Sequence, residues 1–93
     1  MTRPMTPETR ELYRIALLRV LEANETRWGL SAIVLAVHAG AVGFRGLGAE
    51  LASAELRYLQ DKGFVTAAPK EISPENPTWR ITAAGRHWLA QNG

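Results

Sequence analysis

The strongest constraint on the fold lies between residues 49 and 82, where a helical pattern stops at a glycine and two short strands follow. Apolar residues in 49–62 recur at steps of three and four, the spacing of one helix face: Leu51, Ala52, Leu56 and Leu59. Gly63 follows directly, and a glycine at this position typically ends a helix. Residues 64–68 and 78–82 are rich in β-branched or aromatic side chains and are separated by three prolines. They predict an antiparallel hairpin with a long tip.

Two further helical patterns precede this unit. Thr6 and Pro7 are typical of a helix start, and the pattern continues without glycine or proline to about Asn24. The apolar run 32–39 is compatible with a buried strand or with a short buried helix, because both look alike at this length. Ser31 in front of the run is a good helix cap and therefore favours the helix.

The remaining segments complete the expected order of helix, helix, helix, hairpin, helix. Four glycines within residues 40–48 predict a loop. Thr82 is expected to cap a last helix over residues 83–91 that buries Trp88 and Leu89.

Two parts of this pattern resemble the winged helix-turn-helix DNA-binding superfamily. In that family the third helix ends in Leu-x-x-Leu-x-x-x-Gly-Phe/Leu-Val/Ile, and the return strand of the wing ends in an apolar-Thr-x-x-Gly turn. The matching residues here are Leu56, Leu59, Gly63, Phe64 and Val65 for the first motif, and Ile81, Thr82 and Gly85 for the second. The resemblance covers about residues 7–91. It implies an α+β, mostly helical fold with three helices, a β-hairpin wing and a short C-terminal helix.

The resemblance also implies one domain over residues 1–93, with an N-terminal arm at 1–6 and the wing hairpin at 64–82. The function it implies is that of a small transcriptional regulator of bacterial or phage type, which binds double-stranded DNA as a dimer in the cytoplasm. The candidate DNA-binding residues lie on and around the third helix and on the wing: Arg45, Glu50, Ser53, Arg57, Gln60 and Lys70. Arg57 suits a guanine edge, whereas Ser53 and Gln60 suit phosphates or an adenine.

The charge pattern favours a second hypothesis. Eleven Lys and Arg against nine Asp and Glu leave a net charge of +2, and no block of like charge stands out. In the third helix Glu50, Glu55 and Asp61 offset Arg57 and Lys62. A neutral helix has little attraction for phosphate. The alternative function is therefore a winged-helix module for protein–protein contact in a phage or other macromolecular assembly.

Other function classes lack the residues that they need. The chain has no cysteine for a disulfide, a thiolate metal site or a nucleophile, and no apolar run near the roughly 18 residues that span a membrane. His38 and His87 are far apart and have no acidic neighbours in a metal-binding pattern, so we expect His38 to pack at a helix end and His87 to be exposed. We expect no secretory signal, no metal, no cofactor and no enzymatic activity.

The first helix predicts self-association. Apolar residues cover well over half of its circumference, which is more than one small core needs. We therefore expect a homodimer in which the first and last helices pair, with Leu12, Leu18 and Trp88 as anchors. The three tryptophans, Trp28 among them, are expected mainly in the core or sealing the hairpin.

Overall fold

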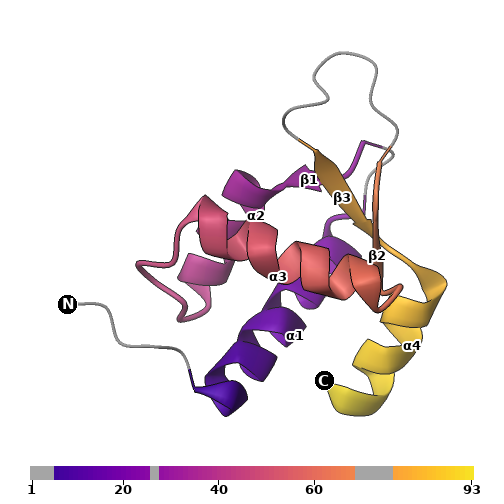
Figure 1. Cartoon of the computed structure of the whole chain (residues 1–93), viewed down its shortest axis with the longest axis horizontal. Helices are drawn as coiled ribbons and strands as arrows, with labels where there is room; N and C mark the ends of the chain where they lie inside the picture. The colour runs from indigo at the N-terminus through magenta and orange to yellow at the C-terminus, as the bar shows by residue number, and fades with distance from the viewer. Residues whose placement is uncertain (1–5, 26–27, 69–76) are drawn as a thin grey trace.

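The computed structural model describes residues 6–25, 28–68 and 77–93. Four helices and three strands follow one another in the order α1 (Pro7–Ala23), β1 (Leu30–Ser31), α2 (Ala32–Ala41), α3 (Ala49–Asp61), β2 (Val65–Ala67), β3 (Thr78–Ile81) and α4 (Ala83–Asn92) (Figure 1). The chain is thus α+β and mostly helical, as predicted, and the order of its elements is consistent with a winged helix-turn-helix. The predicted positions of the N-terminal arm and of the wing tip lie outside the described residues.

Side-chain caps begin three of the helices at the predicted residues. The hydroxyl of Thr6 accepts the backbone N–H of Thr9 at 3.1 Å, and that of Ser31 accepts the N–H of Val34 at 3.3 Å. Each cap satisfies one of the backbone donors that the first turn of a helix leaves free. The apolar run after Ser31 is therefore helical, and it continues to Ala41.

The sheet contains the predicted hairpin and one strand that the sequence did not reveal. Strand β3 lies in the middle of the order β1-β3-β2, and both pairings are antiparallel. Val65 pairs with Ile81, whereas Trp79 lies between Ala67 on one side and Leu30 on the other. Strand β1 has two residues, too few to show a period of alternation in the sequence.

The two motifs of the resemblance meet at the junction between α3, the hairpin and α4. Gly63 has a φ of +81°, which a glycine adopts readily, and it turns the chain into β2. The hydroxyl of Thr82 donates to the carbonyl of Gly63 at 2.6 Å and accepts the N–H of Gly85 at 3.0 Å. A Cβ at Gly85 would overlap the carbonyl of Phe64, so only glycine lets α4 pack this closely against the hairpin.

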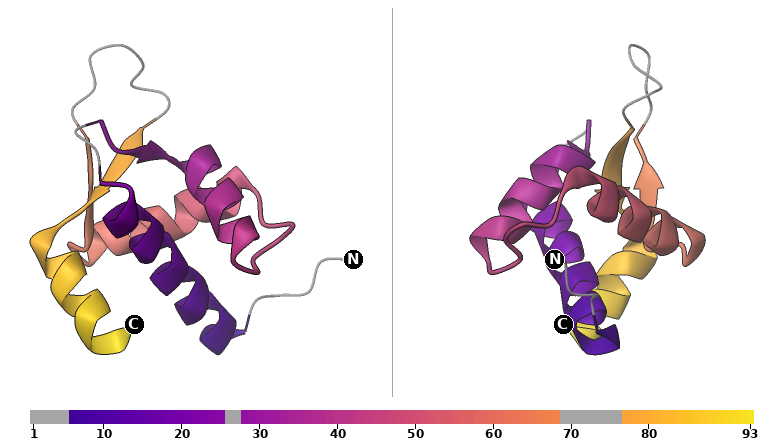
Figure 2. Two further views of the ribbon diagram at one scale, coloured as in Figure 1. Left: turned by 180° about the vertical axis from the view of Figure 1, so that it is seen from behind. Right: turned by 60° about the vertical axis from the view of Figure 1, so that its left-hand side comes forward.

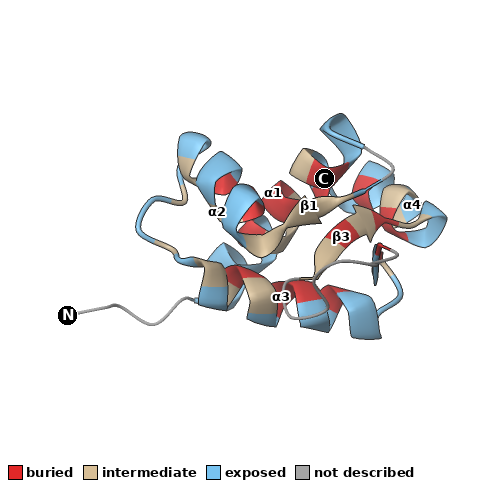
Figure 3. Ribbon diagram, turned by 90° about the horizontal axis from the view of Figure 1, so that it is seen from above, coloured by how far each residue is buried: buried red, intermediate tan, exposed pale blue. Residues whose placement is uncertain are grey.

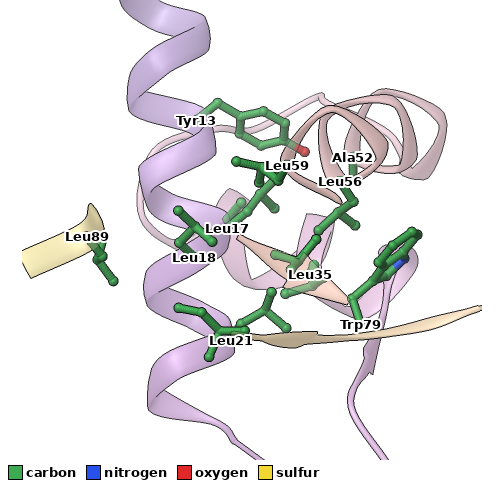
Figure 4. Close-up of a cluster of buried hydrophobic side chains, with 13 residues drawn as sticks. Tyr13, Leu17, Leu18, Leu21, Leu35, Ala52, Leu56, Leu59, Trp79 and Leu89 are labelled. Carbon is green, nitrogen blue, oxygen red and sulfur yellow. The ribbon is translucent and has the colours of Figure 1, made fainter. Parts of the chain in front are cut away.

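Helix α1 lies between α2 and α4 and supplies much of the core (Figure 2). Figure 4 shows Tyr13 of α1 pointing toward α3 and Leu18 pointing to the side of Leu89, with Trp79 of the sheet next to Leu56. The most fully buried large side chains are Tyr13, Leu17, Leu18, Leu35, Leu56, Leu59 and Val65. Leu18 has no exposed surface and therefore cannot anchor a dimer, contrary to our expectation from the sequence.

The tryptophans differ in their burial. Trp79 is 4% exposed and belongs to the core, as expected. Trp88 is only half-buried and stacks on Phe64 with their ring centroids 5.4 Å apart. The expectation for Trp28 was wrong, because 65% of its surface is exposed. It lies in the turn before β1.

Candidate nucleic-acid interface

A hollow of about 380 Å³ lies where the start of α2, one edge of α3 and the base of the hairpin meet. Its lining residues are Ser31, Ala32, Ile33, Ala49, Ser53, Arg57, Pro77 and Trp79. Three elements that are distant in the sequence thus line one hollow. Trp79 closes the hollow from the core side, whereas Arg57 is exposed.

The amphipathic pattern of α3 places two predicted site residues in this hollow. Ala49, Ser53 and Arg57 are spaced by four residues and therefore follow one edge of the helix. The buried side of the same helix consists of Ala52, Glu55, Leu56 and Leu59. Figure 3 shows this alternation of buried and exposed positions along α3. Packing of the leucines against α1 thus determines which edge faces the hairpin.

A buried carboxylate fixes α3 against α1. The residue Glu55 is 5% exposed, and its Oε2 lies 2.5 Å from Nε of Arg14 while its Oε1 lies 3.5 Å from Nε of Arg10. The guanidinium of Arg14 also lies 3.6 Å from the ring centroid of Tyr58, one turn further along α3. A buried carboxylate requires such partners because burial alone strongly disfavours its charge.

This cluster corrects the charge analysis of the third helix. We counted Glu55 among the surface acids that offset Arg57 and Lys62, and that was wrong. Its position among the leucines of the helical repeat, one residue before Leu56, was the available signal. The exposed charges of α3 are therefore two acids, Glu50 and Asp61, and the two cations. With Glu55 buried, two exposed acids balance two exposed cations, so the exposed surface of this segment is neutral.

Tyr13 of α1 adds an uncharged contact beside the cluster. Its ring is fully buried, and its centroid lies 5.2 Å from that of Phe44 in the loop between α2 and α3. Burial raises the pKa of the Tyr13 phenol, and the negative charge of Glu55 raises it further. The phenol therefore stays neutral at physiological pH, so it can hold the loop in place without adding a charge.

Three other predicted site residues do not line this hollow. Glu50 and Gln60 are exposed on α3, and Arg45 is exposed in the loop before it. Lys70 lies outside the described residues. The sequence analysis missed Ser31 and Pro77 as lining residues, because neither carries a charge or belongs to the third helix. Arg57 forms no ion pair with any residue of the described ranges, so its guanidinium is available to a partner.

The histidines form no site in the described part of the chain. His87 is exposed, as expected, but His38 is exposed too, and its Nδ1 lies 2.9 Å from the carbonyl oxygen of Val34 in its own helix. His38 does lie in the last turn of α2, as expected, but the expectation that it packs there was wrong. Within residues 6–25, 28–68 and 77–93, no three His, Asp or Glu side chains are grouped so that they could hold a metal ion. No helix of these ranges is long and apolar enough to cross a membrane.

Comparison with known proteins supports the fold but gives no family. No family model and no curated protein sequence match the chain. The crystal structure of a candidate transcriptional regulator from Thermoplasma acidophilum, TA0346, is similar with a TM-score of 0.80. The similarity covers 97% of this chain and 83% of that one, at 16% sequence identity. At this identity the comparison shows that the two chains share a fold.

Proposed function

We propose that the chain is one winged helix-turn-helix domain that binds double-stranded DNA as a homodimer and regulates transcription, without catalytic activity of its own. The observation that carries the proposal is the position of Arg57 and Ser53 in a hollow beside the start of α2. The description of the T. acidophilum protein as a candidate transcriptional regulator supports it.

The arrangement suits the way in which helix-turn-helix proteins contact DNA. The second helix of the motif enters the major groove, and the first helix crosses the backbone. Here α3 presents Arg57, whose planar guanidinium can contact a guanine edge with two hydrogen bonds. The start of α2 at Ser31 provides a helix N-terminus, which favours a phosphate. Ser53 and Gln60 add uncharged hydrogen-bond donors that can contact the same DNA.

The charges on α3 and on the loop before it determine the affinity of this contact for DNA. Glu50 and Asp61 repel phosphate, whereas Arg57 and Arg45 attract it. Each protomer therefore has a weak sequence-independent attraction, and two protomers that contact two half-sites are needed for useful affinity. Lys70 of the wing is a further proposed phosphate contact.

A selection from random double-stranded DNA at low salt tests the proposal. We expect wild-type protein to enrich a sequence, and Arg57→Ala to weaken its binding by about 1–3 kcal/mol and to relax the preference at one base pair. Glu50→Gln is expected to bind more tightly, because it removes a charge that repels phosphate. The matched control is Arg19→Ala, which removes a cation that contacts the carbonyl of Gly93 at the chain end.

One result favours the second candidate function, a module for protein–protein contact. If no DNA is enriched and both α3 variants bind random DNA as the wild type does, α3 is not a DNA-binding helix. The observation that supports this candidate is the exposed pair of acids on α3, since a DNA-binding helix gains nothing from them.

A further inference from the structure

The hollow beside the start of α2 carries one positive charge and no negative charge. Among its described lining residues Arg57 is the one cation, and none is Asp or Glu. Glu50 follows the lining residue Ala49 directly, but it is exposed and does not line the hollow. The wall also contains the hydroxyl groups of two serines, which can donate hydrogen bonds. This set of groups favours a ligand with a single negative charge.

Helices α2 and α3 both begin at this hollow. Ala32 is the first residue of α2 and Ala49 is the first residue of α3, and both line the hollow. The hydroxyl of Ser31 accepts one donor of the first turn of α2, the N–H of Val34. Gly48, the N-cap of α3, has no side chain that could accept a donor. The first turn of each helix therefore keeps backbone N–H groups without a partner inside the helix, and both helix dipoles favour an anion there.

The indole of Trp79 is an independent indication of a ligand. Trp79 is 4% exposed and lines the hollow. Its Nε1 is buried and has no hydrogen-bond partner in the part of the chain that the structure describes. Figure 4 shows this nitrogen on the side of the ring that faces away from Leu56. Buried N–H groups in proteins are nearly always paired, because an unpaired one is unfavourable, so this donor indicates an acceptor that enters from the hollow.

We propose that the hollow binds a small organic monocarboxylate with an apolar body, and that this ligand regulates DNA binding. The one cation, Arg57, matches the single charge of a carboxylate, and Ser53 and Trp79 add donors for its oxygens. The volume of about 380 Å³ lies within the range of small-molecule sites, and Ile33 and Pro77 provide apolar wall for the rest of the ligand. A carboxylate that pairs with Arg57 takes the guanidinium away from DNA. Only this regulatory effect rests on the proposed function.

Titration of the full chain with benzoate, in the absence of DNA, tests the site. Benzoate should shift the NMR signal of the Trp79 indole N–H and saturate at about millimolar concentration, as expected for so small a ligand. The Trp79→Phe variant identifies this signal. Arg57→Gln should weaken binding at least about tenfold, because it removes the charge that pairs with the carboxylate. Lys62→Gln is the matched control, since it removes an exposed cation directly after α3 that does not line the hollow, and it should leave binding unchanged.

Other outcomes of the titration overturn the inference. The absence of a saturable shift, or equal affinity of the wild type and Arg57→Gln, means that the hollow is not a carboxylate site. Equal binding of uncharged benzyl alcohol means that it is merely apolar, and inorganic phosphate that binds as tightly as benzoate assigns it to the DNA backbone.

A competition experiment tests the regulatory effect separately. Saturating benzoate should release the selected DNA more strongly than sodium chloride of the same ionic strength does, because benzoate occupies Arg57. Equal release by the two salts overturns the regulatory part of the inference. Because the titration contains no DNA, its failure leaves the selection result intact, and failure of the selection leaves the carboxylate site intact.

Discussion

Helices α2 and α3 follow each other in the chain but differ in both of their surfaces. Leu35 and Ala39 attach α2 to the core through apolar contacts, whereas α3 adds a buried carboxylate that two arginines of α1 bind. Outward, α2 shows aliphatic side chains and no charge, and α3 shows charged and polar groups with Arg57 at the hollow. Two helices of one small domain thus present opposite chemistry to their surroundings.

The difference indicates that the two surfaces serve different partners. The guanidinium of Arg57 is exposed and forms no ion pair within the described residues, so it suits a polyanion rather than an apolar partner. An uncharged aliphatic surface suits another apolar surface, and DNA offers none of comparable size outside its bases. In our account α3 and the hollow contact DNA, whereas the aliphatic surface of α2 suits an apolar partner. Ile33 is one of the exposed aliphatic side chains of α2 and also lines the hollow, so the two surfaces adjoin.

The largest effect on stability is expected from Glu55→Gln, which removes the charged anchor specific to α3. It leaves the largely buried guanidinium of Arg14 with only the exposed carboxylate of Glu11, 3.7 Å away, and breaking a buried pair costs about 3 kcal/mol of unfolding free energy. Urea unfolding measures this loss. The matched control is Glu50→Gln on the exposed side of the same helix, where surface substitutions change stability by less than about 0.5 kcal/mol.

Amide hydrogen exchange of the Glu55→Gln variant compares the local stability of the two helices. We expect faster exchange in α3 than in α2, because α2 does not depend on the ion pairs. Equal losses for the Glu55 and Glu50 variants would contradict the view that a charged anchor distinguishes α3 from α2.

A smaller effect on stability is expected at Glu25. Its carboxylate is partly exposed, whereas that of Glu55 is buried. Its carboxylate contacts Arg86 and lies 3.7 Å from Nη2 of Arg80. The hydrogen bond from Arg86, together with the positive charges of both arginines, lowers the pKa of Glu25 below its ordinary 4.5. A lowered pKa in the folded chain means that the pair stabilises above pH 4.5 and that this stabilisation is lost as the pH falls toward the lowered value.

Thermal unfolding between neutral pH and pH 3 measures this contribution. The wild type should lose more stability on acidification than Glu25→Gln does, whereas Glu22→Gln, which removes an acid of α1 without an ion pair in the described ranges, should behave as the wild type. Identical acid profiles for all three proteins would mean that solvent screens the pair completely.

The sequence predicted the junction at Gly63 and Thr82 because each of these residues acts locally. A glycine of positive φ and a threonine cap depend on a few neighbouring residues, so their positions can be read along the chain. The sheet was predicted less completely, since β1 pairs with β3 through two residues and depends on Gly29, where a Cβ would lie 2.5 Å from the carbonyl oxygen of Trp79.

The candidate site was predicted only in part, and the reason differs from that for the sheet. Helical spacing grouped Ser53 with Arg57, but it did not reveal that Ser31 and Pro77 complete the hollow, because those contacts span different elements. The sequence also showed that apolar surface exceeded the needs of one core and assigned the excess to the first helix. The structure buries most of the apolar side chains of that helix and leaves exposed aliphatic side chains on α2, because which side of a mainly apolar helix is covered depends on its neighbours.

The salt dependence of DNA binding tests the central claim, that α3 and its surroundings contact the phosphate backbone, most directly. Arg45 and Lys70 are the proposed phosphate contacts of each protomer, and they predict that the logarithm of the association constant falls against the logarithm of the salt concentration with a slope of about −4 for a dimer. Arg45→Ala should reduce this slope to about −2, because one phosphate contact per protomer is lost. A slope near zero in the wild type, or the same slope in the variant, would contradict the account.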